Sequence, residues 1–439
     1  MGGIRGISVV RPGAKLAETV FRPADFLKYL STKTNLPGPL VRTLEEREAF
    51  PGLSIPTAQF ATSASAREFI GSLKSTKAKL GWNRGRERFQ FFLDTPTPAQ
   101  ISALSASALL HNAKVDPKEI KVVIHCGSHH QFSSPGDAAA IAHLIGSTAT
   151  GFNVDAACAG IGAQVQSAVG MVRMMPREAK ILCTGVSMLG SNALARLTED
   201  PTQVVFGDLS YAMLVDGSGE CLAIGNAALN EYSGAIGMPY KSHSTVNVVN
   251  LDQARELTAK VLPLAKRALE NALADGLGEA DTFGAVSPTL LLSSALADSP
   301  AVFLSQWALK DVRVGGPSRM KDLGLILSHQ PFCGVLEEMA AEFGVDKKKT
   351  FSTFRRDGNI SFCGVAAALH RAISIGKVRR GDLVGCAPFG AGMSCFSWVD
   401  KLTKEMVASV VPAKRDGLDD DEVGSGTKLN AAFDFDKGK

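Results

Sequence analysis

Apolar and polar residues follow two alternating patterns along this chain. Short apolar runs bounded by turn residues predict buried strands over residues 3–10, 118–130 and 179–187. Longer segments with apolar residues three or four positions apart predict helices over residues 98–115 and 159–175. Because predicted strands and helices alternate along the chain, the pattern predicts a layered α/β fold.

The same rhythm returns after a linker rich in Gly, Ser and Tyr near residues 230–248. A long helix is predicted over residues 253–276 despite Pro263, followed by a buried strand over residues 322–331 and a helix over residues 332–345. Two segments of similar rhythm predict a duplicated arrangement.

The end of the chain has a different composition. Residues 401–439 contain the run DGLDDDEVGSG and few large apolar residues. Such a segment buries too little apolar surface to offset the entropy lost on folding. We therefore predict an acidic, disordered tail.

Overall composition adds mainly exclusions. The 439 residues are 45% hydrophobic and 21% charged, which is typical of a globular protein with a large core. A formal charge of +4 is too small over this length to indicate a nucleic-acid surface. No apolar run reaches the ~18 residues of a membrane span, and the opening MGGIRGISVVRPG lacks the apolar block of a secretory signal. We expect a cytoplasmic protein that binds neither nucleic acid nor membrane.

One of the eight cysteines stands in an unusual neighbourhood. No CxxC pair is present, so most cysteines are expected to be reduced and buried. Cys158 lies in DAACAGIG, where a predicted strand ends and a helix begins. The free amides and dipole at a helix N-terminus favour a thiolate, and small neighbours let a substrate approach. A buried packing role is the alternative, and composition alone favours it.

Three further segments carry candidate chemistry at the ends of predicted elements. His329 ends the apolar strand in LILSHQP, so its imidazole should emerge at the sheet edge. Asn359 stands in DGNISFCG at a turn before a helix, where helix capping is the alternative role. The turn PFGAGM at residues 388–393 exposes backbone N–H groups that are able to bind an oxyanion. Each of these signals is weak alone.

Taken together, these motifs resemble the thiolase superfamily, and specifically its ketoacyl synthase III branch. DAACAGIG, VVFGDLSYAMLVDG, LSHQP, DGNISFCG and PFGAGM occur in the order found in that family, and the resemblance covers roughly residues 80–400. It implies a thiolase-like fold of two pseudo-symmetric βαβαβαββ halves that form a five-layered αβαβα core. We place the N-terminal half at residues 1–225 and the C-terminal half at residues 226–400. The resemblance also implies a dimer, which we expect to be a homodimer.

The resemblance implies roles for individual residues. Cys158 matches the acyl-accepting nucleophile, His329 the catalytic histidine and Asn359 the asparagine beside it. The N–H groups of Cys158 and Ala391 match the oxyanion hole. An acyl thioester of coenzyme A or of an acyl carrier protein would load the cysteine, and a malonyl thioester would then lose carbon dioxide and attack the acyl group. No cofactor is expected.

Substrate-binding residues are carried over in the same way. Phe132 resembles the loop residue that reaches across the dimer into the partner's acyl pocket. Phe206 matches a residue lining the acyl channel, and a core aromatic is the alternative. Leu209 opens a Leu-Ser-Tyr run where the family has Gly-Ala-Gly, so its bulk should reshape the pocket. Phe332 stands where many members have Asn, so their coenzyme A contacts do not carry over.

A group of basic residues lies near the expected entrance of the site, judged by sequence alone. The group consists of Lys347, Lys348, Lys349, Arg355 and Arg356. These residues form a candidate docking surface for an acidic carrier protein, and a solvated charged face is the alternative.

A competing constellation is the group His125, Cys126, His129 and His130, since imidazole and thiolate bind zinc. Strand alternation points His125 and Cys126 to opposite faces, and the sequence shows no second ligand cluster. We therefore predict no metal site.

The leading hypothesis is a decarboxylating condensing enzyme of fatty-acid or polyketide metabolism. Added segments at residues 1–80 and 281–317 favour a specialised substrate. An acyltransferase that passes the acyl group from Cys158 to a non-malonyl acceptor is the first alternative, favoured by the altered segment 209–211 and by Phe332. A non-catalytic subunit of a heteromeric synthase is the second, and the intact catalytic set argues against it.

Overall fold

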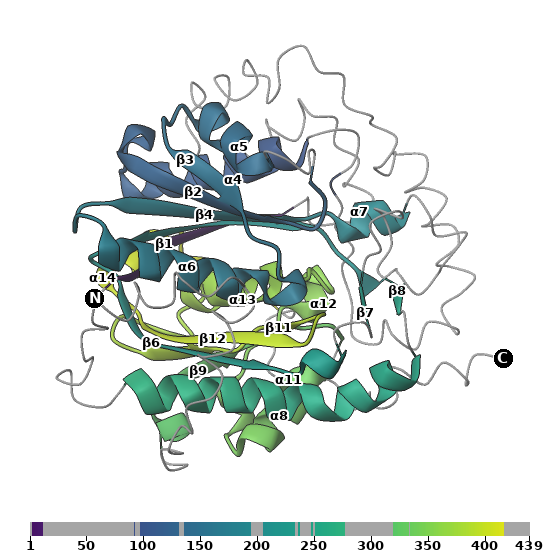
Figure 1. The fold of residues 1–439 in the computed structure, drawn as a ribbon. Coiled ribbons are helices and arrows are strands. Elements are labelled where there is room, and N and C mark those ends of the chain that lie inside the picture. The colour runs from purple at the N-terminus through teal and green to yellow at the C-terminus, as the bar shows by residue number, and fades with distance from the viewer. Residues whose placement is uncertain are drawn as a thin grey trace, which may run out of the picture.

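The structure is a computed structural model in which helices and two sheets alternate in layers (Figure 1). It describes residues 2–11, 92, 97–130, 136–194, 205–232, 236–237, 247–248, 251–276, 319–332 and 334–416. Phe132, nearly all of the added segment at residues 1–80 and all of that at residues 281–317 lie outside the described residues.

The first sheet carries strands from the N-terminal half. In order across the sheet they are β1 (Gly3–Val10), β5 (Leu209–Asp216), β4 (Lys180–Ser187), β2 (Ile120–Gly127) and β3 (Thr150–Asn153). β5 runs antiparallel to β1 and β4, whereas β2 runs parallel to β4 and β3. Every residue of β5 is buried, which explains why this strand reads as a nearly continuous apolar run.

The second sheet repeats this pattern. Its strands are β6 (Glu220–Ala228), β12 (Ser394–Lys401), β10 (Leu383–Cys386) and β9 (Leu325–Leu327), with β11 (Phe389–Gly390) beside the start of β12. β12 runs antiparallel to β6 and β10, and β10 runs parallel to β9. The order β6-β12-β10-β9 therefore matches β1-β5-β4-β2 in direction at every pair, and the expected duplication is confirmed.

This match corrects the boundary between the halves. β6 pairs along its length with β12 and occupies the place that β1 has in the first sheet. The expected boundary between residues 225 and 226 falls inside β6, so the second half begins with this strand. The boundary was misplaced because β6 follows β5 after a short turn but pairs with the last strand of the chain, and local patterns do not show such a pairing.

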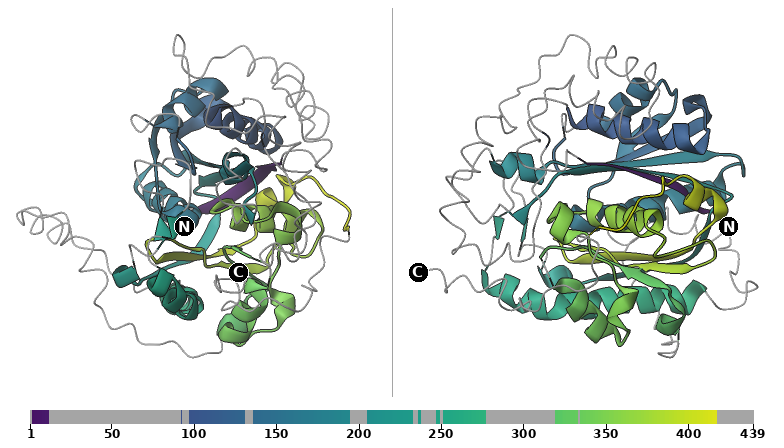
Figure 2. Two further views of the ribbon diagram at one scale, coloured as in Figure 1. Left: turned by 90° about the vertical axis from the view of Figure 1, so that its right-hand side faces the viewer. Right: turned by 180° about the vertical axis from the view of Figure 1, so that it is seen from behind.

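Three layers of helices complete the architecture (Figures 1 and 2). From top to bottom in Figure 1, the layers are α4 (Pro98–Ala113) with α5 (Asp137–Ile145), then α6 (Gly160–Met174) with α13 (Cys363–Ser374), then α8 (Leu251–Gly276) with α11 (Val335–Phe343). α6 contacts strands of both sheets, so the middle layer is buried on two sides. The arrangement is the expected five-layered αβαβα core of a thiolase-like fold.

The remaining described elements are short. They are the 3-10 helices η4 (Pro117–Glu119), η5 (Ala157–Ala159), η7 (Asn230–Tyr232), η8 (Arg319–Asp322) and η9 (Lys347–Lys349), the helices α7 (Leu189–Leu194), α12 (Phe354–Asp357) and α14 (Lys404–Ala408), and the strands β7 (Ile236–Gly237) and β8 (Asn247–Val248). Among the helices that the structure describes, none is long and apolar enough to cross a membrane.

The expected disordered tail was placed too early in the chain. α14 follows β12 directly, and the Thr403 hydroxyl caps its first turn. Met406 and Val410 are buried in the core. Their spacing of four residues forms a short apolar stripe that the average composition of residues 401–439 concealed. Residues 417–439 lie outside the described residues.

A buried polar link holds α6 against the first sheet. Gln164 Nε2 donates to main-chain oxygens of β2 and β4 at 3.2 and 2.8 Å, and its Oε1 accepts a hydrogen bond of 2.5 Å from the Tyr211 hydroxyl. The bulky side chain at position 211 thus points into the core rather than into a pocket. The hydrogen bond from Tyr211 to Gln164 holds α6, the helix that follows Cys158, because Gln164 lies on its first turns.

Candidate active site

The candidate nucleophile lies at a sharp junction between a strand and a helix. β3 ends at Asn153, Cys158 is the middle residue of η5, and α6 begins at Gly160. Ala157, just before the cysteine, has a φ of +44°, which an L-residue rarely adopts. Cys158 is half-buried as a residue.

Ser361 connects the candidate nucleophile to the candidate histidine. Its hydroxyl donates to Cys158 Sγ at 3.3 Å, and its carbonyl oxygen lies 3.2 Å from His329 Nδ1. His329 follows β9 at the sheet edge, as expected, and packs edge-to-face on Phe389 with 5.4 Å between ring centroids. One residue therefore touches two side chains that come from different halves of the chain.

Asn359 lies two residues before Ser361 in the same turn. Its Oδ1 accepts a hydrogen bond of 3.0 Å from Ser361 N, and its own N–H donates to Val205 O at 2.9 Å. Because Oδ1 is engaged in this way, the donor end of the amide, Nδ2, is the end that can serve a ligand. Asp357, two residues before Asn359, anchors the turn. Its carboxylate accepts two hydrogen bonds of 2.8 and 3.0 Å from the guanidinium of Arg11.

The glycine-rich turn lies against the main chain of the nucleophile. Gly390 ends β11, and a Cβ built on it would lie 2.8 Å from Cys158 N, 2.6 Å from Ala159 N and 3.0 Å from Ala156 O. Only a glycine fits this contact. Ala391, whose N–H the oxyanion hole was expected to use, is the next residue and lies in the hairpin loop between β11 and β12.

The Cys158 side chain rests in a state that differs from the expected thiolate. Burial raises the pKa of the Cys158 thiol above its ordinary value, and the hydrogen bonds from Ser361 and from the cysteine's own N–H offset this only in part. Cys158 is a thiol at neutral pH and needs a base to become a nucleophile.

His329 is suited to act as that base. Burial lowers the pKa of His329 to about 4, against the opposing hydrogen bond to Ser361, so the ring is neutral at pH 7. Since the Ser361 carbonyl can only accept, His329 Nδ1 carries the proton and Nε2 presents a lone pair.

Backbone strain gathers at these turns. The described residues include four non-glycine residues with positive φ, and three of them are Ala157, Ser361 and Met393, the last in the loop after Ala391. Conformations of this kind cost roughly 1–3 kcal/mol each and cluster at functional sites. Ser361 was not among the residues expected from the sequence; its place in the Asn359 turn was the available signal.

The structure separates the expected substrate-binding residues. Phe206 is half-buried and forms a one-residue parallel bridge with Asn359, so it borders the site. Leu209 is fully buried at the start of β5, and Phe332 is buried in the core between α8 and α11. Both of these side chains pack in the interior, and Phe132 lies outside the described residues.

The expected basic docking surface is also divided. Lys349 Nζ donates to Leu323 O at 2.9 Å, and Arg356 is buried in an ion pair with Asp416 at 2.6 Å. Lys347 and Lys348 are exposed. The surface that remains for an acidic carrier is therefore smaller than the sequence indicated.

Ser361→Ala should make Cys158 harder to ionise. The Ser361 hydroxyl lowers the pKa of the Cys158 thiol, so its loss raises that pKa and reduces the thiolate fraction at any pH below it. We expect alkylation of Cys158 by iodoacetamide at pH 8 to slow about fivefold, the equivalent of a hydrogen bond worth ~1 kcal/mol. The rate-versus-pH curve should shift to higher pH.

Ser167→Ala provides the matched control for this measurement. Ser167 lies on α6, and its hydroxyl bonds only to Ala163 O among the contacts described for it. It should leave the alkylation curve of Cys158 unchanged. An unchanged curve for Ser361→Ala as well would mean that the serine does not tune the thiol.

Comparisons with other proteins agree with this architecture. Residues 318–401 match the family described as 3-oxoacyl-[acyl-carrier-protein (ACP)] synthase III C terminal. The chain is similar to beta-ketoacyl-[acyl-carrier-protein] synthase III of Clostridium tetani, with 25% identity over 310 residues that cover 70% of this chain and 84% of the relative. The matched range contains His329, Asn359 and Ala391.

Solved structures agree on the fold. The crystal structure of 3-oxoacyl-[acyl-carrier-protein] synthase III from Aquifex aeolicus aligns with a TM-score of 0.57 at 18% identity, over 92% of this chain and 100% of that one. A variant of Xanthomonas campestris OleA aligns with a TM-score of 0.59 at 14% identity, over 91% of this chain and 96% of that one. The repeated strand order, the matched C-terminal family and the sequence relatives agree in one respect: this chain has a thiolase-like fold and is similar to the ketoacyl synthase III-like condensing enzymes.

Proposed function

We propose that the chain forms an acyl-Cys158 intermediate and condenses it with a malonyl thioester in a decarboxylative Claisen reaction. The observation that carries the proposal is the continuous polar chain from Cys158 through Ser361 to His329, with Asn359 in the same turn. A nucleophile, a neutral imidazole and an oriented amide are the groups that acyl transfer and enolate formation need.

In the first half of the reaction, the Cys158 thiol gives its proton to the lone pair of His329. The thiolate attacks the acyl carbonyl, and the oxygen becomes an anion that the N–H groups of Cys158 and Ala391 stabilise. The carbon–sulfur bond of the donor thioester then breaks. Its thiolate takes the proton from His329, which leaves a free thiol and acyl-Cys158.

In the second half, His329 must be protonated in order to donate. With Nδ1 bonded to the Ser361 carbonyl, only the imidazolium offers an N–H at Nε2. The negative charge of the malonyl carboxylate stabilises the imidazolium form of His329, which takes its second proton from solvent. The bond between the malonyl α-carbon and the carboxylate breaks, and carbon dioxide leaves. The enolate oxygen accepts hydrogen bonds from His329 and Asn359. The carbanion attacks acyl-Cys158, and the released thiolate takes the imidazolium proton.

For partners, we propose acyl and malonyl thioesters of coenzyme A or of an acyl carrier protein. The names of the sequence relatives refer to an acyl carrier protein, which supports a carrier-bound substrate. Specialised fatty-acid or polyketide metabolism is the proposed setting, supported by the added segments at residues 1–80 and 281–317.

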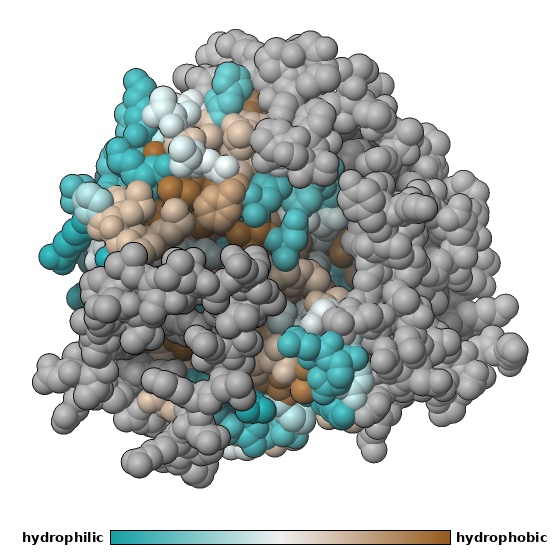
Figure 3. Space-filling view, in the orientation of Figure 1, coloured by the Kyte–Doolittle hydropathy of each residue, from teal (hydrophilic) through white to brown (hydrophobic). Residues whose placement is uncertain are grey.

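A homodimer is supported by the free edge of the first sheet. β3 is the last strand on that side among the described strands, and its Phe152 is 39% exposed. Met174 at the end of α6 is 83% exposed, and Figure 3 shows an apolar band on this face of the molecule. An exposed edge strand beside apolar surface is suited to pair with a second copy of the chain.

Acyl transfer to a non-malonyl acceptor is the second candidate. The observation that favours it is the neutral His329 ring with its lone pair at Nε2, which is suited to accept a proton from an alcohol, amine or carbon acid. The third candidate, a non-catalytic subunit, requires that Cys158 be dispensable to the natural assembly.

The test begins with a panel of acyl thioesters and intact-protein mass spectrometry. Wild type should gain the mass of one acyl group, Cys158→Ala should gain none, and Cys183→Ala, which removes a buried cysteine of β4, should react like wild type. Loaded enzyme is then given a labelled malonyl thioester. Release of labelled carbon dioxide with a β-ketoacyl product supports condensation, whereas acyl loss to other acceptors without malonyl consumption supports the acyltransferase.

A further inference from the structure

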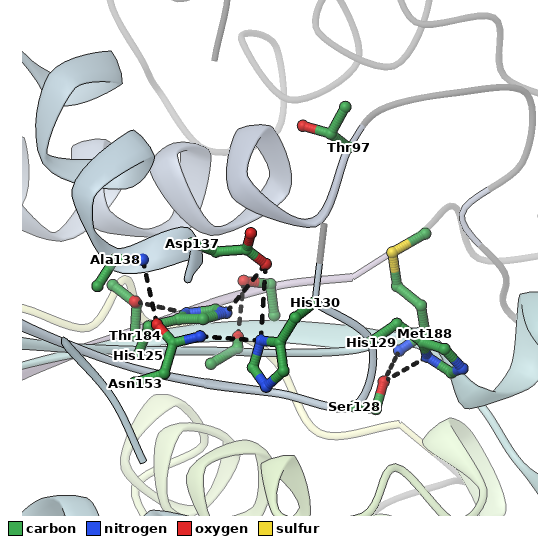
Figure 4. A network of polar contacts seen from close by, with 12 residues as sticks. Thr97, His125, Ser128, His129, His130, Asp137, Ala138, Asn153, Thr184 and Met188 are labelled. Atoms are coloured by element: carbon green, nitrogen blue, oxygen red, sulfur yellow. Dashed lines mark hydrogen bonds and ion pairs between the residues drawn. The ribbon is translucent and has the colours of Figure 1, made fainter. Parts of the chain in front are cut away.

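A second polar cluster lies at the end of β2, on the opposite face of the strand from Cys126. Cys126 points toward the active-site helix, since a Cβ on Gly160 would lie 2.4 Å from its sulfur. His125 points the other way, toward the start of α5 (Figure 4). We propose that His125, His130 and Asp137 bind one divalent transition-metal ion, with Zn²⁺ as the representative. The three candidate ligand atoms, one from each residue, all lie within 4.8 Å of one another.

His125 provides the strongest reason to look for a ligand here. Its side chain has 0% exposure, and its Nε2 has no hydrogen-bond partner within the described part of the chain. Nδ1 lies 3.0 Å from the Thr184 hydroxyl, and Nε2 faces Asp137 Oδ2 at 3.9 Å, too far for a hydrogen bond. A buried polar atom without a partner typically costs 1–3 kcal/mol, and a metal ion would remove that cost.

The bond to Thr184 also fixes which nitrogen could bind a metal. When Nδ1–H donates to the Thr184 hydroxyl, the Nε2 lone pair of His125 points at the centre of the cluster. Metal ligation by histidine requires the neutral ring, with the other nitrogen held by a second partner.

His130 is held in the same manner. Its Nε2 lies 2.9 Å from Asp155 Oδ1, and its Nδ1 lies 3.8 Å from Asp137 Oδ2. A carboxylate that binds the outer nitrogen of a histidine is the usual second partner of a ligating ring. The Asn153 amide nitrogen lies 3.0 Å from Nδ1, and metal binding would replace that contact.

The centre of the cluster is lined by a glycine. A Cβ on Gly127 would lie 3.1 Å from both His125 Nε2 and His130 Nδ1, so any side chain there would fill the space between the two nitrogens. Two imidazoles and one carboxylate form a ligand set typical of Zn²⁺ and Fe²⁺. Ligand atoms of a tetrahedral zinc site are about 3.3 Å apart for bonds of 2.0–2.1 Å. The two separations from Asp137 Oδ2, 3.9 Å to His125 Nε2 and 3.8 Å to His130 Nδ1, must each contract by about half an ångström, and the two imidazole nitrogens start within 4.8 Å of each other.

The alternative is a network of charges without a metal. Burial lowers the pKa of His130, but hydrogen bonds and charges from Asp137 and Asp155 outweigh it and raise the pKa to about 9. A protonated His130 would then lie between two carboxylates. That state leaves His125 Nε2 unpartnered within the described part of the chain, whereas a metal would use all three ligand atoms.

The sequence predicted no metal site because only His125, Cys126, His129 and His130 stood close together in it. Cys126 and His129 do not join the cluster, as strand alternation indicated for Cys126. Asp137 completes it from the first turn of α5, and Asp155 supports it from the segment that leads into Cys158. A bound ion would therefore hold β2, α5 and this segment together without taking part in the reaction.

The test is zinc binding by the full chain after dialysis against a chelator, measured by competition with a zinc-sensitive dye at pH 7.5. Wild type should bind one Zn²⁺ with a Kd of roughly 1 μM or lower. His130→Ala and Asp137→Asn should each weaken binding by at least about tenfold, and Asp155→Asn by roughly 10–100-fold.

Three controls separate this site from other zinc ligands. His143→Ala removes an exposed histidine of α5 and should bind like wild type. Cys158→Ala should also bind like wild type, which distinguishes the cluster from the active-site thiol. Co²⁺-loaded protein should show visible absorption bands that His130→Ala lacks, and far-UV circular dichroism checks that the variants fold.

Two outcomes would overturn the proposal. One is a wild-type chain that takes up no Zn²⁺ at millimolar concentration, which would favour the charge network. The other is binding that His130→Ala and Asp137→Asn leave unchanged or that Cys158→Ala abolishes, which would place the ion elsewhere. Acylation of Cys158 is measured separately, so neither outcome bears on the proposed condensing activity.

Discussion

Gly390→Ala should slow the acylation of Cys158 by about a hundredfold. The new methyl group would lie 2.8 Å from Cys158 N and 2.6 Å from Ala159 N, distances that real Cβ atoms do not keep from main-chain nitrogen. Neither neighbour is a flexible side-chain end, so η5 or β11 must shift. A displacement of about 1 Å at a reacting group costs on the order of a hundredfold in rate. The same methyl group would crowd the Cys158 N–H, which we propose stabilises the oxyanion.

The measurement is the single-turnover rate of acyl-enzyme formation by quenched-flow mass spectrometry. Gly170→Ala is the matched control, because Gly170 lies on α6 and has no atom within 4 Å of a built Cβ. This control should acylate like wild type and gain about 0.5–1 kcal/mol in free energy of unfolding, since alanine is the better helix residue. A normal rate for Gly390→Ala would show that the contact with β11 does not position the nucleophile.

Asn359→Asp should separate the two half-reactions. Aspartate keeps an oxygen that can accept from Ser361 N but loses the N–H donors of the amide. Loss of one donor to a developing oxyanion costs roughly 100–1,000-fold. We therefore expect malonyl decarboxylation and condensation to fall by that factor, while acylation of Cys158 changes by less than about tenfold.

The readouts are carbon dioxide release from labelled malonyl thioester and the acyl-enzyme burst, measured on the same preparations. Asn359→Ala, which removes both the donor and the acceptor, serves as the comparison. It should lose condensation to a similar degree and also disturb the Ser361 turn, with a slower burst. Equal losses in both half-reactions for Asn359→Asp would assign the residue to positioning the turn rather than to the enolate.

Much of the local architecture is visible in the sequence. α4 spans Pro98–Ala113, close to the predicted helix over residues 98–115, and Pro263 lies inside α8 without ending it. The strand-to-helix junction at Cys158 and the strand end at His329 are also where the pattern predicts them. These features depend on residues a few positions apart, so periodicity and turn residues are sufficient to find them.

Other properties of the site depend on partners far away in the chain. The helix N-terminus predicted a thiolate at Cys158, yet burial by the assembled halves raises the pKa of the thiol. The side chains of Leu209 and Phe332, which the resemblance assigns to the substrate pocket, are buried in the two cores. Burial is a property of the whole packing, and a sequence motif does not contain it.

The sequence by itself determined which elements form and which residues end them, because helix and strand preferences act over a few neighbouring positions. Only the tertiary structure decided that the Ser361 hydroxyl meets Cys158, 203 positions away, that Gly390 meets the same cysteine, and that Asp137 faces His125. These contacts arise when two sheets pair strands from distant parts of the chain and bring their loop ends to one place. Packing of this kind also sets the local dielectric, and it thereby decided the protonation of the groups that the motifs had only identified.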